Sequence, residues 1–173
     1  MRRSTAAIVW LVIFAVLAAV AHVVRPPTRA PGAPVTGMAR VVDGDSLEIA
    51  GVRIRLHGID APERDQNCRD AEGRGYACGH AAARALAAVV AGRGVTCTPV
   101  EVDRYNRDVA TCTADGVDIG ETMVRAGHAL DDPRHSRGRY AAAEREARDA
   151  RRGLWAGEFE RPATWRQQNA ARP

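Results

Sequence analysis

The chain of 173 residues contains no lysine, since all 25 of its basic residues are arginine. Together with its many alanines, this is typical of a GC-rich coding sequence, so the formal net charge of +4 is weak evidence for a partner. The charge permits an anionic partner without requiring one. Internal repeats are also absent, and the length allows one domain that buries a core, with appendages.

The four cysteines include no C-x-x-C pair, so the ligand spacing of a zinc site is missing. Outside the cytoplasm such cysteines form disulfides, and four of them allow three pairings. The alternative is that they are free thiols buried as small apolar groups, which requires a reducing compartment.

Charged residues are missing between Ala6 and Val24, a segment long enough to span a bilayer. Two arginines precede it, so its amino end is expected to stay in the cytoplasm. We therefore predict that residues 1–24 form a membrane anchor, or else a signal peptide cleaved after Ala21, where the sequence has the small-x-small form. In the first case the protein lies in the cell membrane with its domain outside the cytoplasm, and in the second it is secreted.

The rest of the chain is predicted to have three parts. Residues 25–37 are rich in proline and form a semi-rigid linker. Residues 38–157 form the folded domain. Residues 158–173 form a tail that shows little pattern beyond Trp165.

Alternating apolar and polar residues indicate strands, two of which form a hairpin around Ala50-Gly51. The predicted strands are 46–49, 52–56, 95–100 and 109–113. A long loop at 59–79 follows the hairpin, and a polar tip at 103–107 joins the last two strands.

Three helices are predicted, at 81–91, 118–126 and 137–152. Asp118 and Glu121 resemble a capping box at the start of the second helix. The third is rich in arginine, which favours a solvated face over a phosphate-binding stripe. These elements indicate an α+β protein that is mainly β, a five-stranded OB-fold-type barrel with three packed helices.

The strand prediction selects one disulfide pairing. If 95–100 and 109–113 pair around the centre of the tip, Cys97 and Cys112 are equidistant from that centre and face each other. Cys68 and Cys78 are then left to pair within the long loop.

Three acidic residues cluster around the first hairpin. Asp45 begins its first strand, and Asp60 and Glu63 follow its second. Taken alone, Asp43-Gly44-Asp45 is typical of a tight turn. Taken together, unpaired acids raise one another's pKa unless a cation lies between them, and oxygen ligands without histidine or cysteine suit Ca²⁺.

Two arginines join these acids: Arg55 in the hairpin and Arg107 at the later tip. A metal ion plus two guanidinium groups can stabilise the charge that develops on a phosphodiester during attack. His57 lies in the same hairpin, but a single histidine in a strand is more often structural.

These residues occur in the stretches "VVDGDSLEI", "RIRLHGIDAPE", "DRYNRDVA" and "RGLWAG". In this order and spacing, they resemble the staphylococcal nuclease-like (thermonuclease) domain over residues 38–157. The resemblance implies an OB-type barrel with three helices and Ca²⁺-dependent hydrolysis of DNA and RNA phosphodiesters.

By this resemblance, Asp45, Asp60 and the backbone carbonyl of Ala61 bind calcium, although the family's well-studied member has threonine at the position of Ala61. Glu63 lies beside the attacking water, and Arg55 binds the phosphate.

Arg107 is implied to bind the phosphate as well, and Tyr105 to bind the substrate. Asn106 replaces a glycine of the family, and asparagine tolerates a left-handed backbone. Asp131 and Asp132 stand near where aromatic residues would flank a bound nucleotide, which puts base stacking in question.

The sequence therefore predicts an exported nuclease that uses Ca²⁺, acts on nucleic acid as a monomer and contacts the membrane through its N-terminal helix. The alternative is an OB-type module that binds nucleic acid or another anionic polymer without cutting it.

Overall fold

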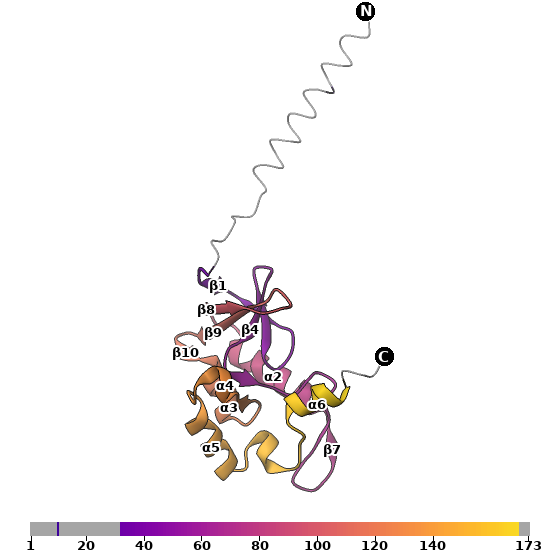
Figure 1. Cartoon of the computed structure of the whole chain (residues 1–173). Coiled ribbons are helices and arrows are strands. Elements are labelled where there is room, and N and C mark those ends of the chain that lie inside the picture. The colour runs from indigo at the N-terminus through magenta and orange to yellow at the C-terminus, as the bar shows by residue number, and fades with distance from the viewer. Residues whose placement is uncertain (1–9, 11–31, 170–173) are drawn as a thin grey trace, which may run out of the picture. The chain divides into compact units, whose positions relative to one another are not determined.

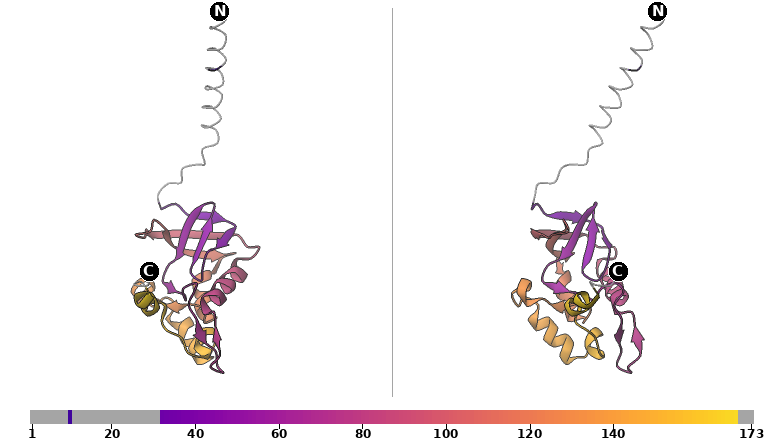
Figure 2. Two further views of the ribbon diagram at one scale, coloured as in Figure 1. Left: turned by 90° about the vertical axis from the view of Figure 1, so that its right-hand side faces the viewer. Right: turned by 45° about the vertical axis from the view of Figure 1, so that its right-hand side comes forward.

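The computed structural model describes Trp10 and residues 32–169. Apart from Trp10, the predicted anchor or signal peptide lies outside these residues, and so does most of the predicted linker. Within the described part of the chain, no helix is both long and apolar enough to cross a membrane. Most strands gather at one end of the domain and most helices at the other (Figures 1 and 2).

The main sheet has seven strands. They are β1 (Val35–Gly37), β2 (Ala39–Val41), β3 (Ser46–Ile49), β4 (Val52–Leu56), β8 (Val95–Val102), β9 (Asp108–Ala114) and β10 (Val117–Asp118). The order across the sheet is β1-β8-β9-β4-β3-β2, with β10 also on β9. Both edge strands, β1 and β2, flank Met38, so the sheet curls until its edges approach each other. This half-barrel with helices confirms the predicted α+β, OB-like fold class.

The two predicted hairpins are confirmed. β3 and β4 turn through Ala50 and Gly51, which have φ of 50° and 81°. β8 and β9 are longer than predicted, because the ladder continues past an irregularity at Pro99. The end of the predicted linker, Val35–Gly37, is β1, because its backbone pairs with β8.

Both predicted disulfides form. Cys97 and Cys112 are register partners on β8 and β9 and are bonded, and so are Cys68 and Cys78. None of the cysteines is free, so the free-thiol alternative is wrong.

The predicted helices correspond to α2 (Cys78–Val90), α3 (Ile119–Arg125) and α5 (Ala141–Asp149). The Asp118 side chain caps α3 by accepting from Glu121 N at 2.9 Å. The predicted start of the last helix at 137 was wrong, because Arg137 has φ of 54° and ends the short α4 (Pro133–Ser136). Tyr140 packs inward ahead of α5, and Ala150 after it is exposed.

The predicted long loop contains local structure. It includes β5 (Ile59–Asp60), which pairs with β11 (Leu130–Asp131), and the hairpin of β6 (Cys68–Arg69) and β7 (Gly75–Tyr76). The predicted tail contains a helix: after η1 (Gly153–Ala156) comes α6 (Pro162–Asn169).

The hydrophobic core has two clusters. The larger lies between the inner face of the sheet and α2, α3 and α5, and includes Leu47, Ile54, Leu86 and Met123. The smaller surrounds the Cys68–Cys78 disulfide with Leu130 and Leu154. The second cluster therefore joins the loop after β5 to the C-terminal part of the domain.

Candidate active site

A pocket opens where the first hairpin, the segment after β5, the β8–β9 tip and α6 meet. Its lining is rich in charged side chains, among them Asp45, Arg55, Glu63, Asp103, Arg107 and Arg166.

Asp45 is held inside this pocket by a tight turn. Its backbone N donates to Asp43 Oδ1 at 3.0 Å, and Val42 N donates to Ser46 O at 2.9 Å. A Cβ on Gly44 would lie 2.7 Å from the Cβ of Ala82, so only glycine fits there. The turn interpretation is thus correct, and the turn also buries the Asp45 carboxylate, which is 4% exposed.

Arg55 links two of the predicted acids. It faces Ser46 across the β3–β4 ladder, within a residue of Asp45, as predicted. Its Nη1 donates to Asp45 Oδ1 at 2.8 Å and its Nη2 to Asp60 Oδ1 at 3.3 Å. The β5–β11 pairing fixes Asp60, and Ala61 N donates to Asp45 Oδ2 at 3.3 Å.

Burial raises the pKa of Asp45 to about 7, although the charge of Arg55 opposes the increase. The neighbouring carboxylates of Asp43 and Asp60 add to it. The ionised form of Asp45 is therefore only partly compensated by its protein partners.

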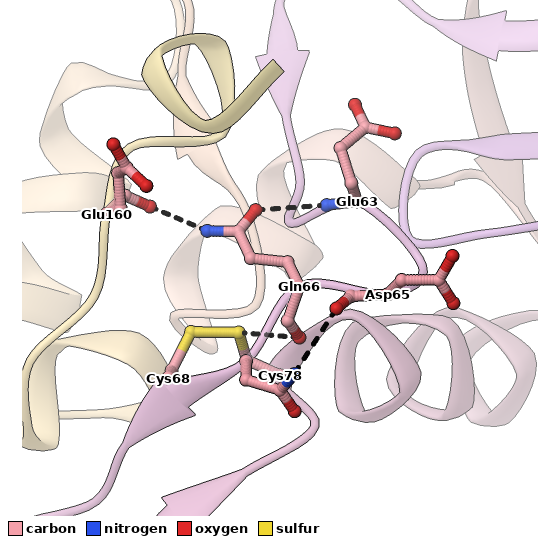
Figure 3. The surroundings of a disulfide bond; sticks show 7 residues. Glu63, Asp65, Gln66, Cys68, Cys78 and Glu160 are labelled. Atoms are coloured by element: carbon pink, nitrogen blue, oxygen red, sulfur yellow. Dashed lines mark hydrogen bonds between the residues drawn. A yellow bond between two sulfur atoms is a disulfide. The ribbon is translucent and has the colours of Figure 1, made fainter. Parts of the chain in front are cut away.

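The backbone of Glu63 is held by the side chain of Gln66, which is fully buried. Gln66 Oε1 accepts from Glu63 N at 3.2 Å, and Gln66 Nε2 donates to Glu160 O at 2.7 Å. Figure 3 shows Gln66 beside the Cys68–Cys78 disulfide, with the Glu63 carboxylate pointing away from it. The backbone of Glu63 is thus connected to the disulfide loop and to the C-terminal segment.

Arg107 is oriented by Asp103 at the β8–β9 tip. Asp103 Oδ2 accepts from Arg107 Nε at 2.8 Å, and Asp103 Oδ1 accepts from the backbone N of Tyr105 and of Arg107, both at 2.9 Å. Asn106 has φ of 58°, the left-handed conformation expected where it replaces glycine. Arg107 Nη1 also donates to Ser46 Oγ at 3.4 Å, which brings the tip to the first hairpin.

Tyr105 remains available at the rim of the pocket. Its side chain is among the exposed large ones, and the Arg104 and Arg107 guanidinium groups lie 5.3 and 5.5 Å from its ring centre. Its backbone carbonyl accepts from Arg53 Nη2 at 3.1 Å, which ties the tip to β4.

Asp131 and Asp132 have different surroundings. Asp132 lines the pocket and caps α4, where it accepts from His135 Nδ1 at 2.9 Å. Asp131 is buried, and its Oδ1 has no hydrogen-bond partner among the described residues. His57 packs its ring edge-on to His135, and burial lowers the pKa of His57.

Arg166 was not predicted as a site residue. It lies on α6, and its Nη1 donates to Asp60 Oδ1 at 2.9 Å and to Glu63 Oε1 at 2.7 Å. The sequence offers a helix-start signal at Pro162, but nothing that directs this helix toward the pocket. Arg55 and Arg166 together pair with all three predicted acids.

In residues 32–169, no three His, Cys, Asp or Glu side chains form a group that could hold a metal ion. The three acids thus alternate with arginines and do not form a carboxylate cage. A smaller donor set, Asp45 and Asp60 with the Ala61 backbone, still suits a hard divalent cation, because it consists of oxygens and the Asp45 carboxylate is buried with incomplete compensation.

The family described as "Staphylococcal nuclease homologue" matches residues 53–157. The chain belongs to this family. Family membership supports nuclease activity, that is, a hydrolase with a nucleic acid substrate, and staphylococcal nuclease homologues are in general metal-dependent.

Individual homologues cover a similar part of the chain. Over 124 residues it is 42% identical to the succinoglycan biosynthesis protein ExoI of Rhizobium meliloti (strain 1021), across 70% of this chain and 65% of that protein. It is 36% identical over 124 residues to an uncharacterized endonuclease of Escherichia coli O157:H7, across 68% and 74%. The probable staphylococcal-like nuclease CAN2 of Oryza sativa subsp. japonica is 36% identical over 122 residues, which are 68% of this chain and 30% of the rice protein.

Proposed function

We propose that this chain is an exported, Ca²⁺-dependent nuclease that hydrolyses phosphodiester bonds of DNA or RNA. The observation that carries the proposal is the convergence of Asp45, Glu63, Arg55 and Arg107 around one pocket, with Asp60 ion-paired to Arg55 behind it. In an anion-binding module the acids would serve only to orient the arginines, as Asp45 and Asp60 orient Arg55. A nuclease would also use the acids to hold a cation and a water molecule.

The metal would be held by the carboxylates of Asp45 and Asp60 and by the backbone carbonyl of Ala61. When bound there, the ion would supply Lewis-acid polarisation of the phosphate.

Arg55 and Arg107 would bind the phosphate with their forked donors and stabilise the negative charge that develops on it. Arg55 is immobilised by Asp45 and Asp60, and Arg107 by Asp103. Because both guanidinium groups are preorganised, little reorganisation is needed during attack.

Glu63 would orient a water molecule and accept its proton during in-line attack on the phosphorus. Gln66 supports this role, since it holds the Glu63 backbone while the carboxylate faces the pocket.

Cleavage of end-labelled DNA and RNA oligonucleotides by the purified full chain tests the proposal. We expect cleavage with Ca²⁺, its loss in excess chelator and a large loss in Glu63→Gln. Glu48→Gln is the matched control, because it makes the same charge change on β3, where Glu48 pairs with Arg40. This variant should cut at the parental rate. Full cleavage in chelator would contradict the metal site, and binding without cleavage would identify a non-catalytic module.

Export is supported by the two disulfides, because such bonds persist outside the reducing cytoplasm. Thiol alkylation of whole cells, followed by peptide mapping, should find all four cysteines oxidised. Mass spectrometry of the amino terminus distinguishes the alternatives, since a cleaved signal peptide leaves a chain that begins after Ala21. Four alkylated thiols in protein made by living cells would contradict export.

A further inference from the structure

Hydrogen bonds attach the C-terminal segment to the loop that carries Glu63. Glu158 and Arg69 exchange backbone hydrogen bonds, with N-to-O distances of 2.8 and 3.1 Å. The buried Gln66 amide donates to Glu160 O at 2.7 Å. Pro162 is buried at the start of α6. These contacts fix the position of α6 beside the pocket.

From its position on α6, Arg166 pairs with both Asp60 and Glu63 through a single nitrogen. Its Nη1 lies 2.9 Å from Asp60 Oδ1 and 2.7 Å from Glu63 Oε1. Arg55 Nη2 donates to the same Asp60 Oδ1 at 3.3 Å. The Asp60 oxygen therefore already receives two positively charged donors.

This arrangement differs from an ordinary surface ion pair. In the Arg40–Glu48 pair on the outer face of the sheet, the side chains are 67% and 29% exposed. For Arg166 and Asp60 the fractions are 39% and 11%. The guanidinium of an arginine is always charged in a protein, so both members of this pair carry charge when Asp60 is ionised. A charged pair that is this shielded from water is weakly screened.

We propose that Arg166 is an internal counter-ion that competes with the divalent cation for Asp60, so that the C-terminal helix sets the metal affinity of the site. This inference rests on the proposed metal site. A cation can take the Asp60 oxygen only if Arg166 withdraws from it, and a guanidinium that stays nearby repels the cation. Even with the full screening of water, a unit charge a few ångströms from a divalent ion changes its affinity by about tenfold.

Isothermal titration of the full chain with Ca²⁺ tests this proposal without any measurement of activity. Arg166→Gln removes the charge and keeps much of the side chain, so its dissociation constant should fall by about tenfold or more. Arg161→Gln makes the same change on an exposed arginine just before α6 and should bind Ca²⁺ like the parent. Arg166→Lys keeps the charge and should remain within about threefold of the parent.

The possible results distinguish a wrong counter-ion role for Arg166 from a wrong metal site. Equal affinity in Arg166→Gln and Arg161→Gln would overturn the counter-ion role and leave the metal site intact. Equal changes in Arg166→Gln and Arg166→Lys would also overturn it, since they would point to helix packing. If no chain binds Ca²⁺, or if Asp45→Asn binds it as the parent does, the proposed site itself is wrong and the inference falls with it.

Discussion

The two halves of the candidate site are held in different ways. The barrel half consists of Asp45, Arg55 and Arg107, which stand on or beside strands of the main sheet. The loop half consists of Glu63 and Arg166, which stand on a segment after β5 and on α6. Backbone ladders position the first half, whereas a buried amide, a disulfide and a docked helix position the second.

The difference divides the pocket into a half that is held rigidly and a half that is easier to adjust. Many cooperative ladder hydrogen bonds hold Arg55 opposite Ser46, so a local change should disturb this half little. The loop half depends on few contacts, above all those of Gln66 with Glu63 and Glu160. Segments held by few contacts open at low free-energy cost, and they are where adjustable parts of a site are expected.

The largest expected effect lies in the barrel half. Arg55→Lys and Arg107→Lys keep a charge but lose the forked donors, so each should lower the cleavage rate by about 10²–10³, or about 3–4 kcal/mol of transition-state stabilisation. Single-turnover cleavage measures this. Arg40→Lys, on the outer face of the same sheet, is the control. A variant at position 55 or 107 that cuts as Arg40→Lys does would remove that arginine from the site.

Removal of each disulfide tests most directly whether the two halves of the site differ in rigidity. Replacing either pair by serines should lower the free energy of unfolding by about 2–4 kcal/mol, because both close short loops. In denaturant titrations the two losses should be similar. Among molecules that remain folded, loss of Cys68–Cys78 should reduce cleavage by loosening the Glu63 loop, whereas loss of Cys97–Cys112 should not. Equal activity in both double variants would show that the loop half is as rigid as the barrel half.

A smaller effect is expected from the amide that supports Glu63. Gln66→Leu leaves the Glu63 N–H and the Glu160 carbonyl without their partner, so it should cost about 1–3 kcal/mol in the free energy of unfolding. Asn67→Leu alters the exposed neighbouring amide and serves as the control. If both variants unfold at the same denaturant concentration, Gln66 does not hold the two segments together.

The smallest expected effect concerns how the stability supplied by the β8–β9 tip depends on pH. Partial burial acts to raise the pKa of Asp103, but hydrogen bonds from Arg107 and Tyr105 outweigh it and hold the pKa below the usual 3.8. The stabilisation is therefore fully present above pH 3.8 and is lost as the pH falls through the lowered value. Thermal unfolding should show the parent more stable than Asp103→Asn at pH 7, by up to about 1 kcal/mol, with the difference shrinking in acid. A difference that grows in acid would reverse the assignment.

Much of the barrel half could be predicted because its signals are local. Alternating residues around Ala50-Gly51 indicate the first hairpin, and its register brings Arg55 to Asp45. The same reasoning applied to the β8–β9 tip pairs Cys97 with Cys112. The break at Arg137 was missed because two left-handed residues, Arg137 and Gly138, interrupt an otherwise helical pattern.

The sequence by itself determined the strands, the turn at Gly44, the cysteine pairs and the family's acids and arginines, because each depends on residues close in the chain or on one ladder register. Only the tertiary structure decided that Arg166 meets Asp60 and Glu63, across 106 and 103 positions of sequence. The reason is physical: where a short terminal helix docks depends on the sum of several weak, distant contacts, such as that of Gln66 with Glu160, 94 positions away. No local pattern in the tail encodes that sum.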